Sequence, residues 1–98
     1  MRHRRTARFV AAYQALPPEI QEQAKRAFRL FQENMSYPGL SIERLEGYPG
    51  VWSGRITRKY RWTFHFEEDP ESGERICVHR YIGAHEDVYR SLKYPDPI

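Results

Sequence analysis

Aromatic and polar side chains alternate without a break in one stretch of this 98-residue sequence, Tyr60-Arg61-Trp62-Thr63-Phe64-His65-Phe66-Glu67. Successive side chains of a β-strand point to opposite faces of the sheet. One face of this segment therefore carries Trp62, Phe64 and Phe66, and the other carries Arg61, Thr63 and His65. The stretch predicts a strand that buries one face and leaves the other polar.

Three more segments with a period of two surround this strand, at residues 40–45, 51–57 and 75–82. Short connections rich in Gly, Pro and Asp separate them, which predicts an antiparallel meander. In the 51–57 segment, Trp52 and Ile56 oppose a polar set of Ser53, Arg55 and Thr57. In the 75–82 segment, an apolar set of Ile76, Val78 and Ile82 opposes Cys77, His79 and Tyr81. Arg80 interrupts this last alternation and indicates a strand end or a bulge.

The first half of the chain has helical spacing instead. Between residues 17 and 34 the apolar positions are Ile20, Ala24, Ala27, Phe28 and Phe31, and the two prolines at 17 and 18 suit a first helical turn. A shorter helix is predicted before it from Phe9, Val10, Tyr13 and Leu16. A brief strand is compatible with residues 4–7, and a last helical segment is predicted at 86–92, before a proline-interrupted tail at 94–97.

These elements predict an α+β fold in one domain spanning residues 1–98, with an N-terminal helical hairpin packed on an antiparallel sheet and a short C-terminal helical segment. No apolar run approaches the length of a bilayer span, and no signal-type apolar stretch follows the basic N-terminus. We therefore expect a cytoplasmic protein with no membrane contact. Cys77 is the single cysteine and lacks the sequence spacing of a zinc site, so neither a disulfide, a metal site nor a cofactor is predicted.

Strand alternation collects chemically active side chains on the face away from the helices. The set is Arg55, Arg61, His65, His79 and Tyr81, with His85 and Tyr89 just beyond the last strand. The net charge is only +3, but basic residues cluster at 2–8, 55–61 and 75–80. Arginine pairs with phosphate, tyrosine stacks on unpaired bases and histidine moves protons near neutral pH, so this surface fits RNA.

Several segments, in order, resemble the RelE/ParE superfamily of bacterial type II toxins, over nearly the whole chain. The segments are Phe9 with Leu16-Pro17-Pro18-Glu19-Ile20-Gln21, residues 34–40, Leu45-Glu46-Gly47, Val51-Trp52-Ser53-Gly54-Arg55-Ile56, Lys59-Tyr60-Arg61 and Ile82-Gly83-Ala84-His85-Glu86-Asp87-Val88-Tyr89. The resemblance implies a helical hairpin against a curved antiparallel sheet. It also implies a cognate antitoxin as partner.

The resemblance further implies site residues for a messenger RNA endonuclease that acts on the ribosome and needs no metal. Arg55 and Arg61 resemble the basic residues on the central strands, His85 the catalytic residue after the glycine, and Tyr89 the aromatic that ends the motif. Ser53 and Tyr81 depart from the pattern, because some relatives carry lysine and arginine there. We expect His85, Arg61 and Tyr89 to be catalytic, and Arg55, Arg61, His65, His79 and Tyr81 to bind RNA.

Three alternatives remain open at this point. A ParE-like inhibitor of DNA gyrase would share the fold and cut no RNA, and a degenerate toxin would only bind its antitoxin. At the level of one residue, His85 would merely cap the final helix. The coexistence of His85, Arg61 and Arg55 favours RNA cleavage, because a gyrase inhibitor has no need of an imidazole there.

Overall fold

Nine elements of secondary structure follow one another in the computed structural model, which describes residues 1–93. They are β1 (Arg2–Arg5), α1 (Ala7–Gln14), α2 (Pro18–Glu33), the 3-10 helix η1 (Pro38–Leu40), β2 (Glu43–Arg44), β3 (Trp52–Arg55), β4 (Tyr60–Glu68), β5 (Arg75–Ala84) and α3 (His85–Ser91). The predicted tail at 94–97 lies outside the described residues.

The predicted helical hairpin is confirmed, and α1 begins directly after its N-cap residue. The Phe9 N–H donates a hydrogen bond of 3.0 Å to Thr6 Oγ1, which makes Thr6 the N-cap of α1. The side-chain amide of Gln21 in α2 donates to the carbonyl oxygens of Tyr13 and Leu16, at 3.1 and 3.2 Å. These bonds satisfy carbonyl groups at the end of α1 and hold the two helices in a hairpin.

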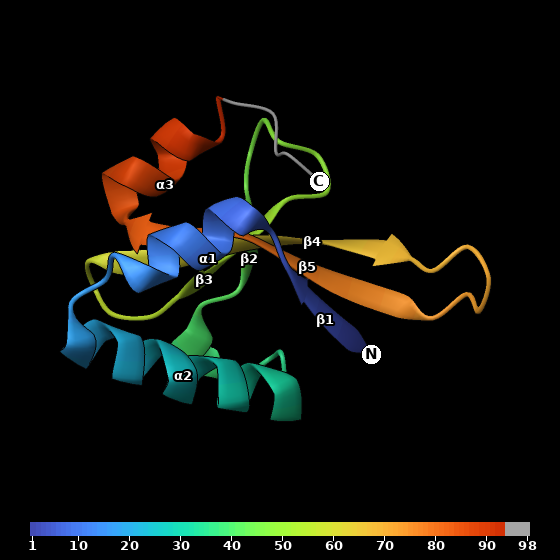
Figure 1. The fold of residues 1–98 in the computed structure, drawn as a ribbon, viewed down its shortest axis with the longest axis horizontal. Helices are drawn as coiled ribbons and strands as arrows, with labels where there is room; N and C mark the ends of the chain where they lie inside the picture. Colours follow the sequence, from blue (N-terminus) through green and yellow to red (C-terminus); the bar gives the residue numbers. More distant parts are fainter. Residues whose placement is uncertain (94–98) are drawn as a thin grey trace.

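The sheet has the strand order β1-β5-β4-β3-β2 (Figure 1). Strands β2 to β5 form the predicted antiparallel meander, but β1 pairs with β5 in parallel, so the sheet is mixed. The strand expected at 4–7 instead covers Arg2–Arg5, because Thr6 already caps α1. In Figure 1 the hairpin of β4 and β5 projects from the body of the molecule, and α2 and α3 lie on opposite sides of the sheet.

The strand predicted at 40–45 is much shorter than expected. Pro38–Leu40 forms the 3-10 turn, and Ser41 then takes a left-handed conformation with φ of 46°. An extended strand cannot pass through such a residue, so pairing begins only at Glu43. Among the described helices the longest, α2, has 16 residues, and none combines the length and apolar character that crossing a bilayer requires.

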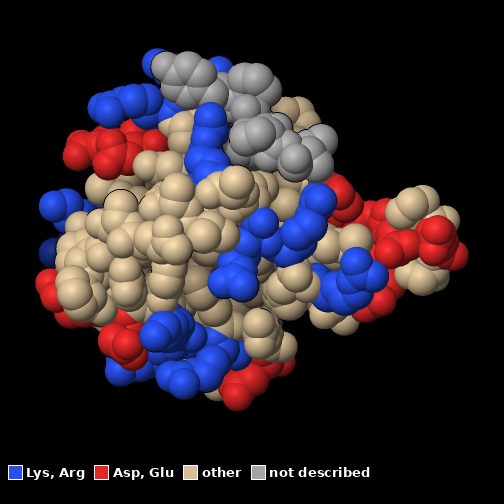
Figure 2. Space-filling model, viewed as in Figure 1, with Lys and Arg blue, Asp and Glu red and all other residues tan. Residues whose placement is uncertain are grey.

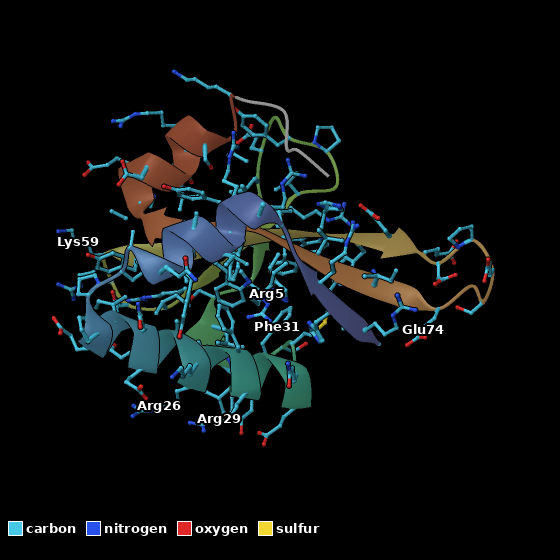
Figure 3. All side chains as sticks on the ribbon, viewed as in Figure 1. Arg5, Arg26, Arg29, Phe31, Lys59 and Glu74 are labelled. Carbon is cyan, nitrogen blue, oxygen red and sulfur yellow. The ribbon has the colours of Figure 1, made fainter. Side chains whose placement is uncertain are left out.

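The core lies between α1, α2 and one face of the sheet, which we call the helix face. Phe31 of α2 points toward the sheet while Arg26 and Arg29 point away from it (Figure 3). The Phe31 ring meets Trp62 and Phe64 edge-on, with ring centroids 5.5 and 4.9 Å apart. The opposite face, which carries Arg61, Thr63 and His65 on β4, is called the far face below; this division of β4 agrees with its sequence pattern.

Arg80 forms the bulge that the broken alternation of β5 indicated. Thr63 pairs with Tyr81, whereas Phe64 pairs with His79, so Arg80 is the extra residue. Because one extra residue inverts the alternation, the half of β5 before the bulge is turned over relative to our prediction. The residues on the helix face there are Cys77 and His79, whereas Ile76 and Val78 lie on the far face.

Candidate functional site

Two arginines meet on the far face at the end of the sheet. Arg55 ends β3, Arg61 follows the first residue of β4, and the two are direct cross-strand partners. Opposite residues of an antiparallel pair have Cβ atoms roughly 5 Å apart, so two positive charges share one small region. Both side chains are half-buried, and such a concentrated charge is suited to binding an anion.

Arg61 has a charged neighbour that partly neutralises it. Its Nη1 lies 3.5 Å from Glu43 Oε1 on β2 in an ion pair. The same nitrogen is buried and has no hydrogen-bond partner among the described residues. The Arg61 side chain as a whole is 21% exposed, so a bound phosphate could use guanidinium donors that Glu43 does not occupy.

On β5, the cross-strand partner of Arg61 is Gly83, which has no side chain and leaves space for the Tyr81 ring. A Cβ placed on Gly83 would lie 3.0 Å from Cε2 of Tyr81, so the phenol ring lies beside the glycine. Burial raises the pKa of Tyr81, and the nearby Asp87 carboxylate raises it further. The Tyr81 hydroxyl therefore stays protonated at neutral pH and can donate a hydrogen bond.

His85 and Tyr89 lie just beyond the same end of β5. His85 is the first residue of α3, its side chain is exposed, and its ring meets that of Tyr89 at a centroid distance of 4.7 Å. The His85 N–H donates to the carbonyl of Lys59 at 2.9 Å, which fixes the start of α3 beside β4. The N-cap of α3 is Ala84, and no side chain caps the helix, so the interpretation of His85 as a cap is wrong.

His65 belongs to a second polar cluster on the far face. Its Nε2 lies 2.7 Å from Glu67 Oε2, its Nδ1 lies 3.0 Å from Arg80 Nη1, and Glu67 also binds Arg4 at 3.0 Å. Since Arg80 can only donate, the bonds fit an imidazole that accepts at Nδ1 and donates at Nε2. The hydrogen bond from His65, with smaller effects from Arg4, lowers the pKa of Glu67.

The two clusters are separated along the sheet. His65 is four residues beyond Arg61 on β4, a distance of roughly 13 Å at strand spacing. Between them, Ser53 and Thr63 are cross-strand partners and are fully buried. Acidic side chains gather at the tip of the projecting hairpin, beyond the His65 cluster (Figure 2). The end of the sheet that carries Arg55, Arg61 and His85 is thus the better place for a polyanion.

His79 does not lie on this surface, contrary to our prediction. It is 6% exposed and packs on the helix face against Phe9, Phe28 and Phe31. Burial, with smaller effects from His3 and Arg5, lowers its pKa to about 3, so the imidazole is neutral at physiological pH. The bulge at Arg80 is the reason, because it turns the preceding part of β5 over.

Sequence reasoning missed the charged residues that contact the predicted ones. Glu67 could have been found, since it follows His65 at a spacing of two in one strand. Arg80 was predicted as part of a basic cluster and as an interruption of the strand, but not as the residue that the bulge brings to His65. Arg4 and Glu43 reach the far face through the pairing of β1 and β2, and no local pattern reveals this pairing.

No family model and no curated protein sequence matches this chain. Solved structures do match. A YoeB/ParE toxin from Agrobacterium tumefaciens superposes with a TM-score of 0.68 at 20% identity, covering 87% of this chain and 99% of that one. A RelB–RelE antitoxin–toxin complex from Methanococcus jannaschii gives a TM-score of 0.64 at 17% identity, covering 94% of this chain and 99% of that one.

The free state of a mutant of the Escherichia coli toxin RelE gives a TM-score of 0.62 at 18% identity, with 94% of each chain covered. These likenesses extend over nearly the whole chain and at low identity. The expected fold, a helical hairpin on a curved sheet with a short C-terminal helix, is therefore confirmed.

Proposed function

We propose that this chain, which has the RelE/ParE fold, is the toxin of a type II toxin–antitoxin pair and cleaves messenger RNA on the ribosome. The observation that carries the proposal is the arginine pair at the end of the far face. Arg61 lies directly opposite Arg55 on the neighbouring strand, and both side chains are partly exposed. The exposed His85–Tyr89 pair follows at the same end of the sheet.

The proposed cleavage of RNA needs only side chains of this surface. The 2′-hydroxyl of a ribose attacks the adjacent phosphorus, a base removes the hydroxyl proton, and an acid protonates the departing 5′-oxygen. This leaves a 2′,3′-cyclic phosphate and a free 5′-hydroxyl. Arg61 and Arg55 stabilise the charge on the pentavalent phosphorus, and His85 serves as the acid or the base.

The aromatic residues near the arginines have supporting roles in this proposal. The Tyr89 ring restricts the orientation of the His85 imidazole and is the second candidate for proton transfer. The protonated Tyr81 hydroxyl lies beside Gly83 and can contact the RNA backbone. His65 extends the RNA contact only weakly, because Glu67 and Arg80 occupy both of its ring nitrogens.

The proposed protein partner is an antitoxin that covers the arginine pair. Its support is the neighbour from Methanococcus jannaschii, which was solved as an antitoxin–toxin complex. An antitoxin that places an acidic side chain on Arg61 would replace the phosphate and silence cleavage.

The test is RNA cleavage by purified protein with translating ribosomes, in the presence of a chelator that removes transition metals but leaves the Mg²⁺ that ribosomes need. His85→Ala should lower the cleavage rate by on the order of a hundredfold or more, the usual size of a general acid–base contribution. Glu86→Gln, on the same turn of α3, is the matched control and should retain activity. Circular dichroism should show both variants folded.

The rivals of this proposal give different results in the same preparation. Full cleavage by a folded His85→Ala protein would remove His85 from the chemistry. If wild-type protein leaves RNA intact but blocks DNA supercoiling by gyrase, the chain is a gyrase inhibitor. If it does neither and binds only its antitoxin, the chain is a non-catalytic binding module.

A further inference from the structure

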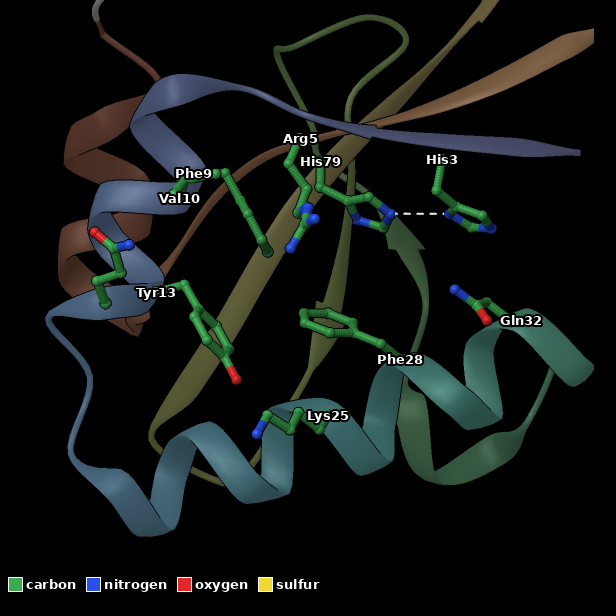
Figure 4. Close-up of a pocket in the computed structure, with 10 residues that line it drawn as sticks. His3, Arg5, Phe9, Val10, Tyr13, Lys25, Phe28, Gln32 and His79 are labelled. Carbon is green, nitrogen blue, oxygen red and sulfur yellow. Dashed lines mark hydrogen bonds between the residues drawn. The ribbon is translucent and has the colours of Figure 1, made fainter.

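Three residues with metal-binding side chains converge on the helix face, away from the arginine pair. His3 on β1 is the parallel partner of Cys77 on β5, and His79 follows Cys77 on the same face of that strand. One ligand atom from each of the three lies within 4.8 Å of the other two. His3 Nδ1 and His79 Nε2 are 3.0 Å apart (Figure 4).

The donor set has two imidazoles, one thiol and no carboxylate, which is the chemistry of a borderline-soft transition metal. Tetrahedral zinc, with Zn–N near 2.0 Å and Zn–S near 2.3 Å, separates two nitrogens by roughly 3.3 Å and nitrogen from sulfur by roughly 3.6 Å. The two imidazole nitrogens are already close to that spacing, and a small movement brings the thiol within reach. Calcium and magnesium do not fit, because they prefer oxygen ligands.

The position of His79 fixes which of its nitrogens a metal could use. The imidazole is 6% exposed, and its Nε2 faces His3 Nδ1. Its other nitrogen, Nδ1, is buried without a hydrogen-bond partner among the described residues and would carry the ring proton when Nε2 binds a metal. We propose that His3, Cys77 and His79 bind one Zn²⁺ ion, with a fourth position open to solvent.

A cavity of about 580 Å³ between α1, α2 and the sheet leads to the two histidines, and Cys77 lies buried behind them. His3 and His79 line this cavity, and so do Arg5 and Lys25 (Figure 4). The two cationic side chains oppose a divalent ion, so affinity must come from its bonds to imidazole and thiolate. Binding replaces the His3–His79 hydrogen bond, and the Cys77 thiol proton passes to solvent.

Such an ion would join β1 to β5 by bonds between side chains. β1 is a strand of four residues at the edge of the sheet, held by backbone pairing with β5 and by the surface ion pairs of Arg2 with Asp69 and of Arg4 with Glu67. A ligand that binds only the folded state stabilises it by mass action. The site lies on the other face of the sheet from Arg55 and Arg61, so it does not depend on the proposed function.

The test is a titration of the reduced, metal-free protein with Co²⁺, which replaces zinc and is visible by absorption. We expect one ion per chain, a thiolate-to-cobalt charge-transfer band in the near ultraviolet, and displacement of Co²⁺ by Zn²⁺. Cys77→Ala should abolish the charge-transfer band. His3→Gln should weaken binding at least tenfold, the lower range for loss of a group at a metal site.

His65→Gln is the matched control, because that histidine lies on the far face, and it should bind Co²⁺ like the wild type. Zn²⁺ should also raise the melting temperature of the wild type but not that of Cys77→Ala, with circular dichroism verifying each fold. Absence of binding would overturn the proposal. The proposal would also be overturned if Cys77→Ala and His3→Gln bound Co²⁺ as tightly as the wild type, because the ion would then be bound by other surface groups. Neither result bears on RNA cleavage, which is assayed with a chelator of transition metals present.

Discussion

Arg80 is the extra residue of a β-bulge in the pairing of β5 with β4, and the bulge changes which side chains of β5 face the helices. Without the bulge, His79 would lie beside His65, as its position in the sequence suggested. With it, His79 packs among aromatic rings, and Arg80 takes the place next to His65. One residue thus separates the predicted histidine cluster into two groups on opposite faces of the sheet.

Gly54 is a second position where a single residue controls packing. The Trp62 ring lies so close to it that a Cβ at this position would overlap the ring. Gly54→Ala should therefore lower the free energy of unfolding by about 1–3 kcal/mol, the usual cost of overpacking a core. Denaturant unfolding of the two proteins measures the difference.

Gly39→Ala is the control for this substitution, since nothing lies within 4 Å of a Cβ there. It should change stability little, or raise it slightly by restricting the unfolded chain. Equal stabilities of Gly54→Ala and Gly39→Ala would show that the Trp62 ring can move aside at no cost.

At the scale of elements, Thr6 connects a strand, a helix and the bulge. Its Oγ1 accepts from the Phe9 N–H at 3.0 Å and donates to the Arg80 carbonyl at 2.9 Å, and its own N–H donates to the His79 carbonyl at 3.0 Å. The start of α1 is therefore fixed to the same part of β5 that carries the bulge. A change at Thr6 should disturb both elements.

Thr6→Ala should destabilise the protein by about 1–2 kcal/mol, because it removes the helix cap and leaves buried groups without partners. Thr6→Ser keeps the hydroxyl and should recover most of that loss. Thermal unfolding and hydrogen exchange of the α1 amides measure the effect. The cap has no role if Thr6→Ser is as unstable as Thr6→Ala.

At the scale of the whole molecule, the sheet separates two kinds of chemistry. The far face carries the arginine pair with His85 nearby, and the helix face carries the core and the His3–Cys77–His79 cluster. Outside both, exposed arginines line the outer side of α2 (Figure 3). These arginines are the natural control for a preference of RNA for the far face.

Arg55→Gln and Arg61→Gln should each weaken RNA binding and lower the slope of log K against log salt by about one, as expected for the loss of a phosphate contact. Arg26→Gln on α2 removes the same charge and should have a smaller effect on both quantities. Binding measured at several salt concentrations gives the slopes. Equal effects of Arg26→Gln and Arg61→Gln would indicate attraction by net charge rather than a site.

Local sequence patterns determined much of the secondary structure of this protein and the faces on which its side chains lie. The helical spacing gave α2 to within one residue at each end, and the alternation of residues 60–67 placed Trp62, Phe64, Arg61 and His65 on their correct faces. Strand alternation also placed Arg55 and Arg61 on one face, while their direct pairing follows from the register of β3 with β4 in the structure. Such features depend on neighbours in the chain, whose geometry is nearly fixed by helix and strand periods.

Only the tertiary structure decided the position of His79, the length of β2 and the contacts of Arg61 with Glu43 and of His65 with Arg80. Each depends on a bulge, on a left-handed residue or on pairing between distant strands, and a one-residue change of register reverses the faces. The His3–Cys77–His79 cluster is the clearest case, since the ligands come from opposite ends of the sequence. The sequence predicted no metal site because His3 has no neighbour with metal-binding chemistry until β1 pairs with β5.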